Sequence, residues 1–410
     1  MSLKKDMTYV VNEAIKRVLP DEAVFRALKR KKFDNSRVYV VSIGKAGWQM
    51  ARAAAEVLGK KIKDGVVITK YDHVMGEIPF VRCYEAGHPV PDQNSFLATR
   101  AAIEMVENLT ADDSVLFLIS GGGSALFEQP LVSEDELADI TKQLLSCGAD
   151  IVEINTIRKR LSAVKGGKFA QICAPASIYS IVLSDIIGDP LDMIASGPVC
   201  ADSTTCEKAL RIAEKYHLCI SEEAQKCLRK ETPKKLNNVE TVITGSVREL
   251  CQAAAAACRD LGYETTILTE QLECEARSAG EFLASIAKTY EETKKSLAFV
   301  AGGETIVHLK GDGLGGRNQE LALAAAEGIA GLKNTAIFSV GSDGTDGPTN
   351  AAGGYSDMQT KENLKKHGID IYNVLERNDA YHALKKIDNL IITGPTGTNV
   401  NDVAVLLIKR

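Results

Sequence analysis

The sequence lacks the cysteine patterns that mark metal sites and disulfide frameworks. Its 10 cysteines are scattered along 410 residues, form no C-x-x-C pair and do not cluster with the 6 histidines. This spacing excludes a recognisable structural zinc site and a small disulfide-bonded scaffold. We therefore expect a cytoplasmic protein whose thiols stay reduced.

Long hydrophobic runs and blocks of like charge are also missing. No apolar stretch reaches the roughly 18 residues of a membrane-spanning helix. Lys and Arg total 49 against 54 Asp and Glu, so the net charge is −5. Because neither sign dominates a long segment, we expect neither nucleic acid nor a membrane as a partner. Small-molecule substrates remain, and a homo-oligomer is compatible with this composition.

The chain is longer than a single hydrophobic core usually supports, which favours two domains. Short β-rich runs alternate with helical stretches throughout. This pattern predicts an α/β fold with two Rossmann-like domains, mostly parallel sheets flanked by helices, and an interdomain cleft. We place the boundary in the polar segment 231–238, giving domains 1–236 and 237–410. The expected strands are Val38–Ile43, Val66–Thr69, Val81–Glu85, Val115–Ile119, Tyr179–Ser184, Thr241–Thr244, Thr265–Thr269, Leu297–Ala301, Ile306–Leu309, Ala336–Val340, Leu390–Thr393 and Val403–Ile408.

The most informative segment is an apolar run followed by three consecutive glycines. Val115–Ile119 predicts a buried strand, and a glycine-rich loop follows it directly. Glycines have no Cβ, so they let the backbone turn sharply and bring its N–H groups close to a ligand. Because an anionic oxygen suits such a loop, we predict phosphate or substrate binding there. The loop consists of Ser120, Gly121, Gly122, Gly123 and Ser124.

A second glycine turn, Gly44–Gly47, lies between an expected strand and an expected helix. Lys45 in this turn can place its ammonium where a helix N-terminus already favours an anion. The turn is not a Walker A loop, because the chain contains no G-x-x-x-x-G-K-[S/T]. A surface lysine beside a structural turn is an equally good interpretation of this motif alone.

Five cations are concentrated in Arg158–Arg160 and Lys165–Lys168. Most such charges face solvent, and that is our expectation for each of them except Arg158. Arg158 is the candidate to bind a substrate carboxylate, because a guanidinium matches that group in a bidentate way.

Two acidic loops follow expected strands, one in each half of the chain. Asp185 and Asp189 stand in the first loop, and Asp343 and Asp346 in the second. Carboxylates at strand ends can hold Mg²⁺ or accept a proton from an attacking hydroxyl. Asp and Gly also occur together in turns for purely local reasons.

The segment Gly311–Gly316 satisfies the dinucleotide-binding pattern G-x-G-x-x-G. By itself this is a weak signal, and the same glycines can form a tight turn that positions Arg317. An arginine at a helix start is unfavourable for the helix dipole, so Arg317 indicates an anionic partner.

Taken in order along nearly the whole chain, eight motifs resemble the bacterial and archaeal glycerate 2-kinase family, whose C-terminal part is called the MOFRL domain. Some of its members carry the older label hydroxypyruvate reductase. The motifs are Gly44–Gly47, Gly87–Asp92, Ser120–Ala125, Val164–Lys168, Ser184–Pro198, Gly315–Glu320, Ser342–Pro348 and Gly394–Asn399.

The resemblance implies a two-domain enzyme that uses Mg²⁺ and transfers the ATP γ-phosphoryl group to the 2-hydroxyl of D-glycerate, giving 2-phosphoglycerate and ADP. The functional lysine and arginine of the family carry over to Lys45 and Arg317. We expect the two to converge on the moving phosphoryl group, since such transfers need positioning and charge neutralisation. Asp189 or Asp343 is expected to hold Mg²⁺ or accept the hydroxyl proton, and Asn399 to line the site.

Two other classes of function stay open at this point. An NAD(P)H-dependent hydroxypyruvate reductase is favoured by Gly311–Gly316 and the older label, but hydride transfer usually needs an acid such as His, and no histidine lies in the best loops. A non-catalytic sensor of sugar acids or nucleotides would not require cations from both halves of the chain.

Overall fold

The computed structural model describes residues 2–33 and 37–410, which form two compact units. The N-terminal unit comprises residues 23–183 and 189–244. The C-terminal unit comprises residues 1–22, 184–188 and 245–410. None of the helices within the described ranges has the length and apolar character that a membrane span requires.

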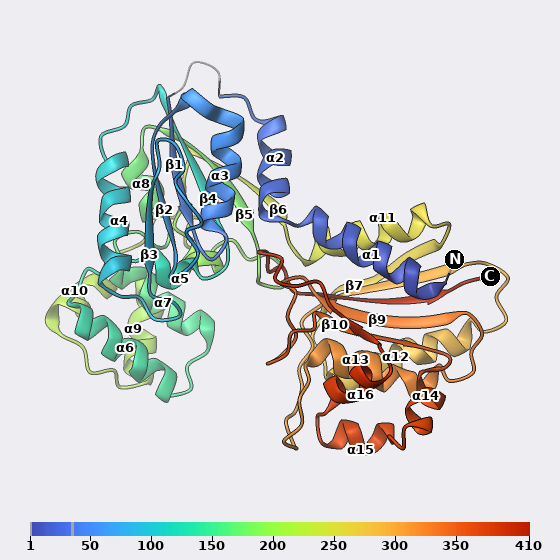
Figure 1. The fold of residues 1–410 in the computed structure, drawn as a ribbon. Helices are drawn as coiled ribbons and strands as arrows, with labels where there is room; N and C mark the ends of the chain where they lie inside the picture. Colours follow the sequence, from blue (N-terminus) through green and yellow to red (C-terminus); the bar gives the residue numbers. More distant parts are fainter. Residues whose placement is uncertain (1, 34–36) are drawn as a thin grey trace. The chain divides into compact units, whose positions relative to one another are not determined.

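The N-terminal unit is built on a six-stranded sheet with the order β3-β2-β1-β4-β5-β6 (Figure 1). Its strands are β1 (Arg37–Ile43), β2 (Ile62–Lys70), β3 (Arg82–Ala86), β4 (Asp113–Ile119), β5 (Ser177–Leu183) and β6 (Val239–Gly245). Its helices are α2 (Pro20–Arg30), α3 (Gly47–Leu58), α4 (Gln93–Val106), α5 (Gly123–Leu126), α6 (Glu134–Ser146), α7 (Ile151–Leu161), α8 (Lys168–Cys173), α9 (Cys206–Lys215) and α10 (Glu222–Leu228), with single 3₁₀ turns at Gly59–Lys61 and Ile194–Ser196.

The strand order reverses between β1 and β4, which pair in parallel with Ile43 opposite Ile119. In an open α/β sheet, ligands bind beyond the carboxyl ends of the strands at such a switch point. The turns that follow these two residues are Gly44–Gly47 and Ser120–Ser124. The two glycine motifs of the sequence therefore leave the sheet side by side, at the position where this architecture places its ligands.

The core on either side of this sheet holds the switch point in place. Residues of one face, among them Val38 and Leu116, pack against α2 and α3. On the other face Phe117 stacks with Phe127 and Phe169, at ring-centroid distances of 5.7 and 5.2 Å. Because Phe127 directly follows α5, this aromatic cluster anchors the end of the glycine loop to the sheet.

The C-terminal unit contains a second six-stranded sheet, in the order β11-β10-β9-β12-β8-β7. Its strands are β7 (Glu264–Leu272), β8 (Leu297–Gly303), β9 (Thr335–Gly341), β10 (Gly353–Asp357), β11 (Leu390–Ile391) and β12 (Asp402–Ile408). Its helices are α1 (Leu3–Arg17), α11 (Val247–Asp260), α12 (Ala276–Thr289), α13 (Arg317–Gly328), α14 (Thr360–Lys366), α15 (Ile371–Glu376) and α16 (Ala380–Lys386).

The second sheet is covered on both faces and is mixed in direction. Ala298 and Val300 of β8 pack with α1 and α11, whereas Leu297 and Phe299 pack with α12 and α13. Figure 1 shows α1 and α11 on one side of this sheet and α12 and α13 on the other. Strands β7, β8, β9 and β11 run in one direction, and β10 and β12 run antiparallel to them. The predicted α/β class with two helix-flanked sheets is confirmed, with the last strand inserted antiparallel between β8 and β9.

Two details differ from the sequence-based expectations. The predicted strand Ile306–Leu309 makes only an isolated bridge between Ile306 and Glu275. The compact units also divide the chain differently from 1–236 and 237–410. β6 completes the first sheet, because Ile178 N–H and Ser184 N–H bond to the carbonyls of Asn238 and Gly245, while α1 packs on α11 of the C-terminal unit.

Candidate active site

Backbone hydrogen bonds lock the two glycine motifs of the N-terminal unit together. Ser120 donates both its N–H and its Oγ to the Ile43 carbonyl, at 3.0 and 3.1 Å, and its Oγ accepts the Ala46 N–H at 3.0 Å. The Lys45 N–H donates to the Gly121 carbonyl at 2.8 Å. A Cβ on Gly44, whose φ is +107°, would lie 2.3 Å from Ser120 Oγ. Only glycine therefore permits this close approach.

Lys45 is half-buried at the switch point, next to the glycine loop. A Cβ on Gly122 would lie 2.9 Å from the His88 ring and 3.4 Å from Lys45 Cγ, so the three residues are neighbours. Burial and the positive charge of Lys45 lower the pKa of His88 below its usual 6.5. The ring is thus neutral near pH 7. The sequence pattern by itself indicates no role for His88, although this residue lies in the family-like motif Gly87–Asp92.

The cation-rich segment does not face solvent as expected. Lys159, Arg160 and Lys165 are buried, and Lys159 and Arg160 form ion pairs with the buried Asp202 at 3.2 and 3.7 Å. A buried charge requires such a partner, and Asp202 comes from a distant stretch of the chain that spacing alone does not reveal. The expectation of solvated charges is wrong for these three residues.

Arg158 lies beneath the glycine loop. Its Nη2 donates to the Ser124 carbonyl at 3.1 Å and lies 3.7 Å from the buried Glu128 carboxylate. Only 16% of its side chain is exposed. Arg158 therefore supports the loop backbone, and its contact with a substrate carboxylate stays a prediction.

A strained segment packs against the other side of the same loop. Ala195 and Ser196 are buried with φ of +51° and +59°, a region that non-glycine residues rarely adopt. Ser196 Oγ donates to Asn155 Oδ1 at 3.0 Å and lies 3.3 Å from Ser124 Oγ. Strained backbone of this kind persists only where its surroundings hold it, and it is concentrated at functional sites.

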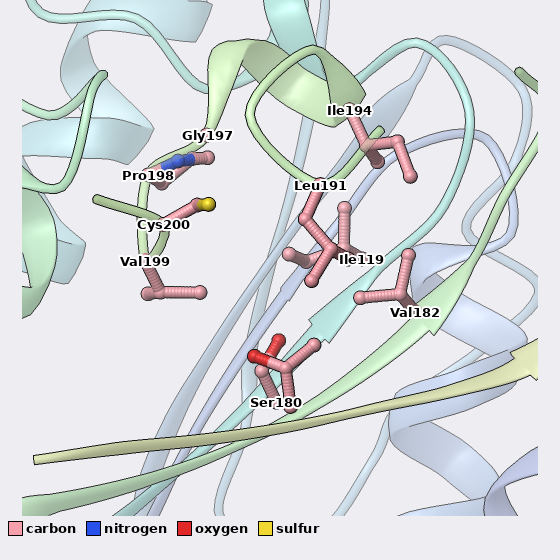
Figure 2. Close-up of a pocket in the computed structure, with 10 residues that line it drawn as sticks. Ile119, Ser180, Val182, Leu191, Ile194, Gly197, Pro198, Val199 and Cys200 are labelled. Carbon is pink, nitrogen blue, oxygen red and sulfur yellow. The ribbon is translucent and has the colours of Figure 1, made fainter. Parts of the chain in front are cut away.

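Figure 2 shows a small apolar cavity between the sheet and this segment. Its volume is about 30 Å³, enough for about one water molecule. Ile119, Val182 and Ile194 contribute apolar side chains to its wall, and Cys200 adds a thiol whose pKa is raised by burial. The cavity is too small for a sugar acid or a nucleotide.

Asp189 lies in the segment that follows β5 and has a positive φ of +53°. Its Oδ1 is buried and has no hydrogen-bond partner within the described ranges. Buried carboxylate oxygens are normally satisfied, so this atom is available for a ligand.

In the C-terminal unit, Arg317 begins α13 and is bound by two carboxylates. Its Nε and Nη2 lie 2.5 and 3.2 Å from the oxygens of Asp402, and its Nη1 lies 2.6 Å from Glu304. Burial raises the pKa of Asp402 to about 6, although Arg317 opposes this shift. The anionic groups that contact Arg317 in this structure are thus the carboxylates of Asp402 and Glu304.

The two aspartates of the predicted acidic loop, Asp346 and Asp343, make hydrogen bonds to nearby backbone N–H groups. Asp346 accepts the N–H groups of Asn318 and Gln319, so it caps α13, and burial raises its pKa. Asp343 is half-buried and accepts the Thr345 N–H at 2.9 Å. Asn399 is exposed. Within the described residues, no group of three His, Cys, Asp or Glu side chains is placed to hold a metal ion.

The segment Gly311–Gly316 does not form a dinucleotide-binding turn. Gly313 N–H donates to the Arg377 carbonyl at 2.9 Å, and the Gly311 and Leu314 N–H groups are held by the side chains of Asn378 and Asp379. A Cβ on Gly313 would lie 2.4 Å from the Arg377 carbonyl oxygen. Gly313 serves close packing, and the N–H groups of Gly311, Gly313 and Leu314 are not free for a pyrophosphate.

The sequence was compared with family profiles and with proteins of known function, and both comparisons identify its family. Residues 6–229 match the profile described as a domain of unknown function, DUF4147, and residues 297–402 match the MOFRL family. The D-glycerate 2-kinase of Thermotoga maritima is 51% identical, with 99% of each chain covered. A protein of Agrobacterium vitis that is provisionally named hydroxypyruvate reductase is 39% identical, covering 91% of this chain and 99% of its own. The chain belongs to the glycerate 2-kinase family.

Solved structures agree with this assignment. The crystal structure of glycerate kinase from Thermotoga maritima matches with a TM-score of 0.96 and covers 99% of each chain. A structure from Pyrococcus horikoshii, 39% identical, matches with a TM-score of 0.94 and covers 100% of this chain and 99% of its own.

Proposed function

We propose that this protein transfers the γ-phosphoryl group of ATP to the 2-hydroxyl of D-glycerate, giving 2-phosphoglycerate and ADP. The observation that carries this proposal is the 51% identity to the D-glycerate 2-kinase of Thermotoga maritima over 99% of both chains. The placement of Lys45 and the glycine loop at the sheet's switch point supports it, because this is where α/β enzymes bind phosphorylated ligands.

Lys45 and Arg317 are the proposed catalytic cations, one from each unit. Phosphoryl transfer passes through a loose transition state, so positioned positive charge contributes more than a covalent partner does. Lys45 has its backbone fixed by the bonds to Gly121 and His73. The pair Arg317–Asp402 similarly restricts the guanidinium, whose Nη1 side borders the half-exposed Glu304. If a phosphoryl oxygen of the substrate replaced the Glu304 carboxylate at Nη1, Arg317 would contact the substrate directly.

The Ser120–Ser124 loop and Arg158 are proposed to bind the ATP phosphates or the glycerate carboxylate, with Asn399 at the edge of the site. Asp189 is proposed to contact Mg²⁺ or to accept the hydroxyl proton, and its Oδ1, which has no hydrogen-bond partner among the described residues, suits either role. Asp343 is the second proposed carboxylate for Mg²⁺. Mg²⁺ needs only one or two carboxylates when nucleotide phosphates complete its shell, so the residues present fit it. When bound, it neutralises charge on the β- and γ-phosphates.

A coupled assay decides between this reaction and the reductase alternative. D-Glycerate, ATP and Mg²⁺ are supplied in one cuvette and ADP release is followed, while hydroxypyruvate and NADH are supplied in another. We expect ADP formation and no NADH oxidation. NADH loss without ADP formation would overturn the proposal, and the occupied N–H groups of Gly311, Gly313 and Leu314 argue against that outcome.

A further inference from the structure

Lys165 supports the glycine loop from inside the protein. Its side chain is completely buried, and its Nζ donates to the carbonyls of Ser124 and Phe127, at 2.8 and 2.9 Å. These carbonyls belong to α5 and the residue after it, the turn into which the glycine loop runs. Any movement of the Lys165 ammonium would therefore move the backbone of the loop.

The charges around Lys165 are unbalanced. Glu128 lies 3.4 Å from Lys165 Nζ and 3.7 Å from Arg158 Nη2, so one carboxylate faces two cations. Glu128 is fully buried, and neither of its oxygens has a conventional hydrogen-bond partner within the described ranges. Arg158 Nε is also buried without a partner there. The cluster thus leaves an excess positive charge directly behind the Ser120–Ser124 loop.

Fold stability by itself does not account for this arrangement. Buried ion pairs with unsatisfied groups stabilise a protein less than apolar side chains of the same volume would. Lys168, three residues further on, shows what a structural lysine does here. Its Nζ binds the carbonyls of Lys159, Arg160 and Ser162 at the end of α7, whereas Lys165 Nζ binds those of Ser124 and Phe127.

We propose that Lys165 is a positioning residue for the anion that the Ser120–Ser124 loop binds, because it fixes the loop backbone and supplies the buried positive charge behind it. This rests on the proposed function, in which that loop holds either the ATP phosphates or the glycerate carboxylate. A negative group at the loop is attracted by the excess charge across a medium of low dielectric, where screening is weak.

The ionisation of Lys165 agrees with this geometry. Burial and the neighbouring Arg158 lower the pKa of Lys165 to about 8, whereas Glu128 opposes the shift. Burial also lowers the pKa of Lys168 to about 8, so the arginine variants of the two lysines must be compared to assign the pH dependence. In the free protein the ammonium therefore loses its proton as the pH rises through about 8. Binding of the anion should weaken over the same range, since the charge behind the loop disappears.

The test compares Lys165→Met with Lys168→Met; the second variant removes a lysine of the same motif whose ammonium binds the end of α7 instead of the loop carbonyls. Lys165→Met is expected to raise the KM of one anionic substrate, ATP or D-glycerate, by about tenfold or more, and the affected substrate identifies the anion that the loop holds. Lys168→Met is expected to lower the melting temperature and leave both KM values within about twofold. If the two variants lose stability alike and neither KM changes for Lys165→Met, the proposal is wrong.

Two more variants keep the proposal testable if Lys165→Met folds poorly. Glu128→Gln keeps the shape of the side chain and removes the negative charge, so it should lower the same KM; a rise would contradict the proposal. Lys165→Arg keeps the charge and should abolish the fall of kcat/KM above pH 8, whereas Lys168→Arg should retain it. A fall that persists in Lys165→Arg would also contradict the proposal.

Failure of the proposed function gives a different result. In that case wild-type protein forms no ADP with D-glycerate, and the variants are compared by calorimetry for the Kd of ATP and of D-glycerate separately. A tenfold weaker Kd for one ligand in Lys165→Met but not in Lys168→Met would still support the role of Lys165. Equal Kd values in both variants would overturn it.

Discussion

Arg317 and Asp402 form a bidentate ion pair across 85 residues of sequence, with Nε and Nη2 lying 2.5 and 3.2 Å from the two carboxylate oxygens. Asp402 is the first residue of β12, the strand inserted between β8 and β9, and Arg317 is the first residue of α13. The pair therefore joins the sheet to a helix start, where a lone arginine would oppose the helix dipole.

The ionisation of Asp402 should set the acid limb of activity. Burial raises its folded-state pKa from the usual 3.8 to about 6, with Arg317 opposing the shift and Asp346 adding to it. Below about pH 6 the carboxylate takes up a proton and holds Arg317 less firmly. We expect kcat/KM to fall about tenfold from its plateau by pH 5, as a single titration requires.

The variant Asp402→Asn is the control for this pH profile. Asp402→Asn should lose the fall of kcat/KM near pH 6 and show a lower plateau. If the fall stays unchanged, another group causes it.

The ionisation of Asp402 changes the stability of the fold in the opposite direction to the activity. Because the folded state binds this proton more tightly than the unfolded chain, the stabilising contribution is complete below about pH 4 and is lost as the pH rises through about 6.

Lys45→Ala and Arg317→Ala should each lower kcat by about 10², the usual cost of losing one preorganised charge. Steady-state kinetics at saturating ATP and D-glycerate measures the effect, and Lys63→Ala, on an exposed position of β2, is the control. Arg317→Ala also leaves Asp402 buried without its cation. The double variant Arg317→Ala, Asp402→Asn removes both charges and separates catalysis from stability. Near-wild-type turnover in either single variant would remove that residue from the mechanism.

Gly44→Ala should destabilise the N-terminal unit by about 2 kcal/mol more than Gly59→Ala does. Both glycines have positive φ, +107° and +50°, but a Cβ on Gly44 would lie 2.4 Å from the Ser120 carbonyl oxygen, whereas no atom of the described residues lies within 4 Å of one on Gly59. Chemical denaturation of the two variants isolates the steric contribution. If both variants lose the same stability, the Gly44 turn is not packed against Ser120 as closely as these distances indicate.

Chelation of divalent cations should abolish kinase activity, and added Mg²⁺ should restore it. Asp189→Asn should raise the Mg²⁺ concentration for half-maximal activity by about tenfold, because the variant lacks the charged oxygen that has no hydrogen-bond partner in the described part of the chain. Asp343→Asn, measured in parallel, shows whether the second carboxylate contributes. Full activity in the presence of chelator would exclude a role for the metal.

Local patterns predicted much of the fold and the place of the glycine loops. Val115–Ile119 lies within β4 and is buried, because a continuous apolar run of this length fits a strand covered on both faces. Gly44 and Gly122 adopt positive φ at strand ends, as their residue type allows. The same reasoning predicted a strand at Ile306–Leu309, and this prediction is wrong, because the segment forms only an isolated bridge between Ile306 and Glu275 in the described structure.

Residue identity and short-range order thus determined which segments become strands, where the chain turns and which family it resembles, since these depend on neighbours in sequence. Tertiary structure alone decided which charges are buried and with what partner. Lys165 contacts Glu128, and Arg317 contacts Asp402, only because segments distant in sequence pack together. The sequence of a motif does not reveal whether its lysine will be exposed to solvent or buried. The free energy of a charge depends on the dielectric and the counter-charges around it, and folding supplies both.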